Sequence, residues 1–195
     1  MNNQFENMET QDLNTNKKFD SIDSLVVNLK KEDLRNLNLM KSFKWIYLVM
    51  IIAYALLMVV NPDSDLKLHT RISGICYVVA FGIFALIFRK YHKEYSEIDY
   101  TVPVLEMLSK AAKRYKFRWK SILICMPSII LIDIGVVLSD FFVNPEIDWS
   151  SIVIFQLIYF GLMTISGFVG YIIWRTRQKP LYDGAIQLLK ELEGN

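Results

Sequence analysis

Residues 149–174 read WSSIVIFQLIYFGLMTISGFVGYIIW, without a single charged side chain. A helix rises about 1.5 Å per residue, so roughly 20 residues cross the hydrocarbon core of a bilayer. The run is long enough to do so, and it predicts a transmembrane helix over 151–174. A soluble domain keeps its apolar residues in short periodic groups, whereas in this chain they form long continuous runs.

Three other apolar runs have the same character. They cover 45–62, 72–88 and 121–142, and the first two are close to the minimum length for a span. The sequence therefore predicts an all-α, polytopic integral membrane protein whose transmembrane domain covers 44–174, with four helices in two hairpins. Short amphipathic helices on the cytosolic side are expected to complete the fold.

The positions of the basic residues predict the orientation of these helices. Seven Lys and Arg residues precede Trp45, nine lie in the loop at 89–120 and four follow Trp174, so 20 of the 22 fall on one side. Short loops rich in Lys and Arg stay on the cytoplasmic side of a membrane. Both termini are therefore expected in the cytoplasm, with the chain in the plasma membrane or bacterial inner membrane.

The tryptophans support the same borders. Amphipathic aromatic rings favour the headgroup layer of a bilayer, and all four indole rings fall at expected helix ends. A chance distribution is the weaker alternative. The predicted interfacial anchors are Trp45, Trp119, Trp149 and Trp174.

Two segments of different composition precede the first span. Residues 1–19 are rich in Asn, Gln, Asp and Glu and predict a disordered tail, because they have too few apolar side chains to bury. Residues 20–43 predict an amphipathic cytosolic helix that either lies flat on the membrane surface or docks a cytosolic protein. The first alternative is favoured, since it needs no partner. The apolar positions of this helix are Ile22, Leu25, Val26, Leu29, Leu34 and Leu37.

The inner loop and the cytosolic tail at 175–195 contain similar elements. Segments 20–43, 101–118 and 180–195 are expected to pack on one another or on lipid, and each is a possible site for a cytosolic protein partner. The basic end of the loop predicts contacts with anionic lipid, and no nucleic acid is expected. The apolar positions are Val104, Leu105, Leu108, Ala112 and Tyr115 in the loop and Leu181, Ala185, Leu188, Leu189 and Leu192 in the tail.

An acid inside the third apolar run is the sharpest candidate site. A carboxyl at that depth costs on the order of 3 kcal/mol on insertion scales, so Asp133 should face other helices or water. Asp140 shares its helix face, and Pro127 can bend the helix six residues earlier.

Two roles are open for Asp133. It either couples a proton or cation to movement, or it hydrogen-bonds polar residues of the fourth span and holds the helices together. The structural role is favoured, because no span supplies a basic partner. The polar residues available on the fourth span are Gln156, Thr164 and Ser166.

Small residues on the fourth span predict close helix packing. Ser166 and Gly170 are four positions apart, a spacing that lets another helix approach. Gly161 and Gly167 belong to the same run, and glycines 74 and 82 of the second span are a possible counterpart. The partner is either another helix of this chain or a second copy in a homodimer.

The two short connections on the outer side have a phrase in common. Asn61-Pro62 and Asn144-Pro145 are both followed by an acidic residue. An internal repeat of two parallel hairpins would explain this similarity. Independent use of Asn-Pro as a turn is the favoured alternative, because the two spans before these phrases differ in length.

The sequence contains no catalytic or ligand-binding motif. A phosphate-binding glycine loop, a zinc-binding His-Glu-x-x-His pair and a Ser-His-Asp set are all missing, so we expect no enzyme and no catalytic, cofactor-binding or metal-ligating residue. The leading hypothesis is a non-enzymatic membrane adapter or regulator that acts through its cytosolic helices. The alternative is a small dimeric transporter or proton-coupled carrier that uses Asp133.

Overall fold

The computed structural model describes the backbone of residues 2–62, 66–117, 119–141 and 149–193. Its side chains are described from Ile22 onward, apart from those of residues 120, 121, 140, 141 and 193. The side chains of the tail expected to be disordered at 1–19 are not described, but its backbone from residue 2 onward belongs to the first helix, Asn2–Tyr54, so the structure gives no support to that expectation.

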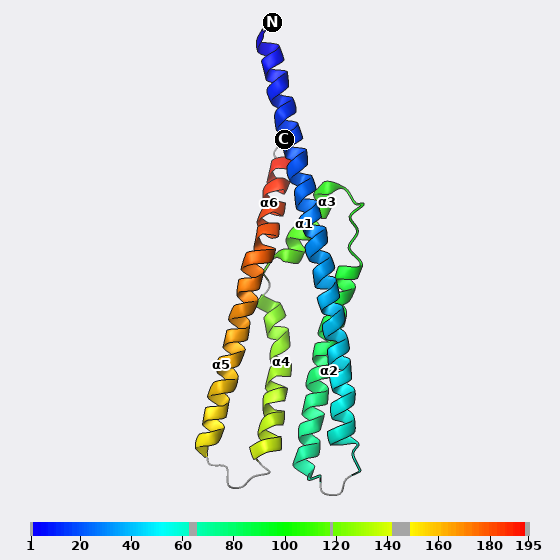
Figure 1. Cartoon of the computed structure of the whole chain (residues 1–195), viewed down its shortest axis with the longest axis vertical. Helices are drawn as coiled ribbons and strands as arrows, with labels where there is room; N and C mark the ends of the chain where they lie inside the picture. The colour runs from blue at the N-terminus through cyan, green and yellow to red at the C-terminus, as the bar shows by residue number, and fades with distance from the viewer. Residues whose placement is uncertain (1, 63–65, 118, 142–148, 194–195) are drawn as a thin grey trace. The chain divides into compact units, whose positions relative to one another are not determined.

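Helices account for every regular element in the described ranges, and Figure 1 shows how they follow one another. Three short segments are π-helical, and the others are α-helices. The elements are α1 (Asn2–Tyr54), η1 (Ala55–Val59), α2 (Leu68–Ser96), α3 (Val104–Tyr115), α4 (Trp119–Val136), η2 (Val137–Phe141), α5 (Trp149–Ile173), η3 (Trp174–Gln178) and α6 (Lys179–Glu193).

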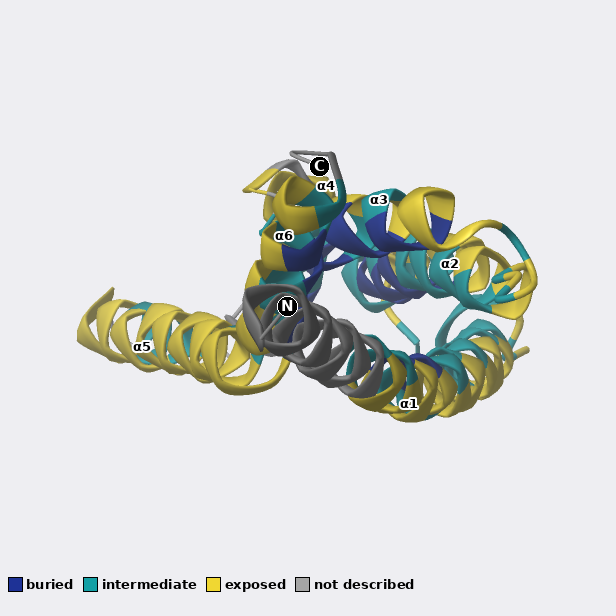
Figure 2. Ribbon diagram, turned by 90° about the horizontal axis from the view of Figure 1, so that it is seen from above, coloured by how far each residue is buried: buried dark blue, intermediate teal, exposed yellow. Residues whose placement is uncertain are grey.

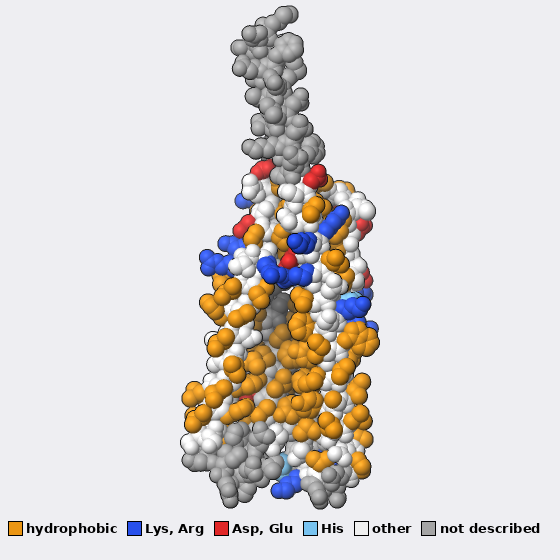
Figure 3. Space-filling model, viewed as in Figure 1, with side chains coloured by type: hydrophobic (Ala, Val, Ile, Leu, Met, Phe, Trp, Pro, Cys, Tyr) orange, Lys and Arg blue, Asp and Glu red, His pale blue; other side chains and the backbone are white. Residues whose placement is uncertain are grey.

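Four stretches are long and apolar enough to cross a membrane. They are residues 22–59, 68–96, 122–139 and 149–192, and each expected span falls on one of them. Hydrophobic side chains form a broad band over these helices in the view of Figure 3. Pro127 lies inside α4 without ending it. The prediction of an all-helical chain with four such segments is confirmed.

The first and third of these stretches end in the same way. Each changes from an α-helix to a π-helical segment, at Ala55–Val59 and at Val137–Phe141, shortly before its Asn-Pro phrase. The Arg71 guanidinium donates hydrogen bonds to the carbonyls of Val59 at 3.1 Å and Asn61 at 3.0 Å, so it caps the end of η1. Residues 144 and 145 lie outside the described part, and the internal repeat stays a prediction.

The chain divides into two compact units. The first unit, which we call the three-helix domain, consists of residues up to 35, 98–116 and 172 onward. The four-helix region comprises 36–97 and 117–171.

The three-helix domain is built on the amphipathic segments found in the sequence. Leu29 of α1, Leu108 of α3 and Ala185 of α6 are fully buried in one apolar cluster. Figure 2 shows the buried faces of α3 and α6 in dark blue. The favoured expectation that segment 20–43 lies flat on lipid is replaced here by packing on protein, at least as far as Leu29. The other buried members of the cluster are Met107, Ala111, Ala112, Tyr115, Leu181 and Leu188.

Four of the expected apolar positions are not in this core, and one of them, Leu37, belongs to the four-helix region. Leu34 is 59% exposed, Val104 is 42% exposed and Leu105 is 46% exposed. The cause is geometric for Leu34, because Asp33 occupies the buried position four residues after Leu29. The two α3 residues belong to its first turn, before the helix reaches the buried positions Met107 and Leu108.

In the four-helix region, aromatic rings join α1 to α2. Ring centroids lie 5.2 Å apart for Phe43 and Phe88, and 5.1 Å apart for Tyr47 and Phe84. Further along, Tyr54 meets Tyr77 at 5.0 Å. Rising numbers on one helix pair with falling numbers on the other, so the two helices run antiparallel. α2 also packs against α4 and against both η1 and η2.

Candidate functional site

The most heavily bonded carboxylate in the described part of the three-helix domain belongs to Asp33. It lies on α1 one turn after Leu29 and is only 4% exposed. A buried carboxylate is costly unless donors and a counter-charge surround it. The fold supplies these groups from α3 and from the connection that precedes it.

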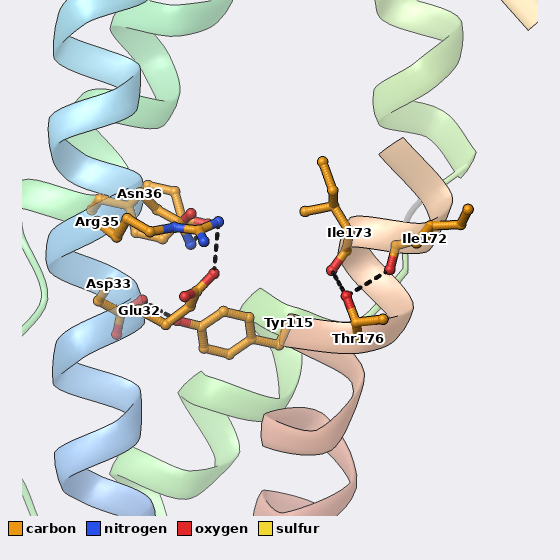
Figure 4. Close-up of polar contacts among 9 residues, drawn as sticks. Glu32, Asp33, Arg35, Asn36, Tyr115, Ile172, Ile173 and Thr176 are labelled. Atoms are coloured by element: carbon orange, nitrogen blue, oxygen red, sulfur yellow. Dashed lines mark hydrogen bonds and ion pairs between the residues drawn. The ribbon is translucent and has the colours of Figure 1, made fainter. Parts of the chain in front are cut away.

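Three side chains donate hydrogen bonds to Asp33. The Arg114 Nη2 atom lies 2.7 Å from Oδ2 and the Tyr115 hydroxyl lies 2.6 Å from Oδ1. The Tyr100 hydroxyl donates to Oδ2 as well. Figure 4 shows Tyr115 reaching across from α3 to Asp33 on α1. Both carboxylate oxygens are therefore occupied by donors from residues 67 or more positions away in the sequence.

The connection before α3 positions Tyr100. Asp99 accepts hydrogen bonds from the backbone N–H of Thr101 at 2.8 Å and from its hydroxyl at 2.7 Å, which lowers the pKa of Asp99. Burial raises the pKa of the Tyr100 phenol, and donation to Asp33 raises it further. The phenol therefore stays protonated and remains a donor. The Lys30 ammonium lies 5.2 Å from the centre of the Tyr100 ring.

Glu32 is the second acid of this cluster. Its carboxylate lies 3.1 Å from the Arg35 guanidinium. Burial raises the pKa of Glu32 above 4.5, the Arg177 charge opposes this rise, and the neighbouring Asp33 charge adds to it. The ionised form is therefore less favourable in the folded domain than in the unfolded chain.

The stability of the domain should depend on pH through Glu32. A raised folded pKa means that the contribution of Glu32 is fully present below pH 4.5 and is lost as the pH rises through the folded value. We therefore expect Glu32→Gln to gain stability relative to wild type as the pH increases from about 4.5 to 7. Chemical unfolding at several pH values measures the difference. An equal difference at every pH would contradict the assignment.

The arrangement at Asp33 favours a structural role over catalysis. A general base needs room for a substrate beside its oxygens, whereas this carboxylate is buried and both of its oxygens already accept from protein donors. Arg114 is also nearly covered, with its side chain 12% exposed. The site locks α1 to the α3 segment in one geometry.

Asp33 was not among the candidate site residues found from the sequence. Its spacing of four from Leu29 places it on the buried face, and that spacing was the available signal. Tyr115 was correctly placed on the apolar face of the loop helix, and it is fully buried. Its role as a donor was missed, because hydropathy does not distinguish a buried phenol from other aromatic rings.

In the four-helix region, Asp133 meets one of its three expected partners. Gln156 Nε2 on α5 donates to Asp133 Oδ1 on α4 at 2.9 Å. Three residues along α5, the Tyr159 hydroxyl donates to the Ile129 carbonyl at 2.9 Å. The two bonds connect facing stripes of the two helices. Tyr159 had not been singled out from the sequence.

Two other polar candidates, Thr164 and Ser166, are not bonded to Asp133 in the described part of the chain. The Thr164 hydroxyl donates to the Phe160 carbonyl of its own helix at 2.8 Å. Ser166 is exposed. The side chain of Asp140 lies outside the described part. A different hydroxyl, that of Ser73, connects α2 to the Gly135 carbonyl of α4 at 2.6 Å.

The three expected packing glycines on α5 have open space beside them in the described part of the chain. A Cβ built at Gly161, Gly167 or Gly170 would meet nothing within 4 Å. Figure 2 shows α5 exposed along most of its length. The close approaches are elsewhere, at Gly74 against Met58 and at Gly135 against Tyr77. Gly74 therefore packs against the end of the first span, and the space at Gly82 is open, so the expected pairing of these two glycines with the fourth span stays a prediction.

The four tryptophans divide into two groups. Trp45, Trp119 and Trp149 are 57%, 71% and 78% exposed, which fits rings that contact a headgroup layer. Trp174 is half-buried, and its indole Nε1 donates to the Tyr115 carbonyl at 3.0 Å. It therefore fixes the end of α3, in addition to any role as an anchor.

The described residues contain no group of three or more side chains suited to a metal ion.

Comparison with known proteins gives no assignment. No protein-family model matches this chain, and neither a curated protein nor a solved structure matches it.

Proposed function

We propose that this chain crosses a membrane four times, in two hairpins with both ends in the cytoplasm, and acts as a non-enzymatic adapter or regulator. The four apolar helices and the uneven distribution of Lys and Arg support the topology. In this orientation the three-helix domain lies on the cytoplasmic side, where a soluble protein can reach it.

One observation carries the proposal. The amphipathic segments cover their apolar faces with one another, around the fully buried Leu29, Leu108 and Tyr115. Segments that served only as membrane-surface helices would keep those faces for lipid. A folded domain with a bonded Asp33 centre instead presents a fixed outer surface, which is what recognition of a protein partner requires.

An exposed stripe on α1 is the best docking surface in the described part of this domain. Val27 is 63% exposed and Leu34 is 59% exposed, and they are two helical turns apart. Lys30 and Lys31 lie between them and are also exposed. An apolar stripe with basic neighbours suits an amphipathic partner segment with an acidic rim.

The test is in-cell proximity labelling with a biotin ligase fused to the C-terminus. The ligase requires cytoplasmic ATP, so labelling also reports on the side of the membrane. We compare the wild type with Val27→Asp/Leu34→Asp. A matched control, Asn28→Asp/Lys190→Asn, makes the same change in charge at two exposed positions outside the stripe.

The proposal expects one set of cytosolic proteins that the wild type and the control label equally. The stripe variant should lose most of that labelling while the protein level is unchanged. Identical labelling by all three proteins would reject the stripe as the recognition surface. Absence of any cytoplasmic labelling would reject the orientation.

The alternative of a transporter that uses Asp133 has less support. Gln156 already donates to this carboxylate, and the described spans bring no basic residue to it. Both features support a role in holding α4 and α5 together. Asp133→Asn retains an oxygen acceptor, so on this view it should leave the labelling pattern unchanged.

A further inference from the structure

A pocket lies between α1 and α2 inside the four-helix region. Its volume is about 260 Å³. It is lined by three residues of each helix, namely Lys44, Trp45, Leu48, Ala85, Leu86 and Arg89. The members of each set are at positions i, i+1 and i+4, so each helix presents one face to the pocket.

The antiparallel course of the helices separates its charged and apolar parts. Lys44 directly precedes the first apolar run and Arg89 directly follows the second, so both cations lie at the same end of the antiparallel pair. Leu48 lies about one helical turn from Lys44, and Leu86 lies just under one turn from Arg89. Both leucines are on the side of these cations that faces the apolar middle of the helices. Leu86 is 65% exposed and Leu48 is 36% exposed, so this part of the pocket is open at its side.

The local charge is entirely positive. No Asp or Glu occurs between Leu34 and Pro62 or between Leu66 and Lys93. No described carboxylate forms an ion pair with Lys44 or Arg89. The Lys44 ammonium lies 5.5 Å from the centre of the Trp45 ring, which holds it beside the pocket.

We propose that this pocket binds the phosphate of an anionic glycerophospholipid in the cytoplasmic leaflet. Lys44 and Arg89 take the phosphodiester between them, Trp45 lies at the glycerol level, and one acyl chain follows Leu48 and Leu86. Basic pockets between transmembrane helices on the cytoplasmic side suit such headgroups. The site rests on the membrane topology proposed above and not on the adapter role.

The experiment titrates the purified, delipidated protein in detergent with phosphatidylglycerol and follows the bound lipid by native mass spectrometry. Parallel titrations use phosphatidylcholine and inorganic phosphate. The test variant is Lys44→Gln/Arg89→Gln. Lys41→Gln/Lys90→Gln is the matched control, since it also removes two positive charges, from exposed neighbours outside the pocket.

Phosphatidylglycerol should bind the wild type and the control with similar affinity and the pocket variant about tenfold or more weakly. Phosphatidylcholine should bind weakly to all three. Equal loss in the two variants would reject the pocket in favour of general surface charge. Tight binding of inorganic phosphate would reject a lipid as the ligand.

A further variant keeps the two proposals separate. Val27→Asp/Leu34→Asp is expected to bind phosphatidylglycerol as the wild type does, because its changes lie in the three-helix domain. If this variant lost lipid binding but kept its cytoplasmic labelling, only the assignment of the lipid to the pocket would be overturned. If it lost labelling but kept lipid binding, the result would support the stripe as the recognition surface and the pocket as the lipid site.

Discussion

Asp33→Ala is expected to unfold the three-helix domain or bring it close to unfolding. The substitution removes the acceptor for Tyr100 and Tyr115 and leaves the Arg114 charge, 12% exposed, without its carboxylate. Removing one partner of a buried ion pair costs about 3–5 kcal/mol. The total stability of a domain is only about 5–15 kcal/mol, so this loss is a large fraction of it.

Amide hydrogen exchange in detergent measures this effect segment by segment. Exchange should accelerate in 104–115 and 181–192 of Asp33→Ala and stay slow in α2, which belongs to the four-helix region. Asp33→Asn, which keeps one acceptor oxygen, should give a smaller effect. Asp23→Ala is the matched control, because Asp23 is an exposed acid on the same helix. Equal protection in Asp33→Ala and Asp23→Ala would contradict the role of Asp33.

Gly74→Ala is expected to cause the second large loss of stability, this time in the four-helix region. A Cβ at Gly74 would lie 2.6 Å from the Met58 Cβ and 3.4 Å from the Met58 carbonyl carbon. The nearest atom is attached to the backbone and cannot swing away, so α2 and η1 must separate. Overpacking of this kind typically costs about 1–3 kcal/mol.

The control for this substitution lies on the same helix. A Cβ at Gly82 meets nothing within 4 Å, so Gly82→Ala should be neutral or gain up to about 1 kcal/mol from helix propensity. The two variants are compared by the fraction of each protein that remains soluble and monodisperse after heating in detergent. Gly74→Ala should lose this fraction at a lower temperature than wild type. If the two alanine variants behave alike, the close approach of α2 to η1 is wrong.

Short-range features account for what could be predicted. Apolar length alone identified the four long helices, because crossing a bilayer requires a continuous run that no other structure needs. Helical spacing likewise identified the buried positions Leu108, Ala112, Tyr115, Leu181, Ala185 and Leu188. Both signals are periodic and local, so each is complete within its own segment.

The contacts that matter for the proposals are not local. The residues next to Asp33 in the sequence do not reveal that Tyr100, Arg114 and Tyr115 surround it in the fold. Gly74, Gly82, Gly161 and Gly167 all lie in apolar runs, yet of these four only Gly74 is a position where an added Cβ would meet a described atom of another segment within 4 Å. Spacing on one helix cannot say which face another helix covers.

The sequence by itself thus determined the class of this protein: helical, with four membrane-length segments and amphipathic helices between and after them. Hydrophobic burial fixes that class, since it depends on the length and period of each segment and not on its partners. The tertiary structure alone decided that the amphipathic faces cover one another, that Asp33 is bonded and that Lys44 and Arg89 border one pocket. Each of these depends on directional contacts between residues far apart in the chain, which only the folded arrangement brings together.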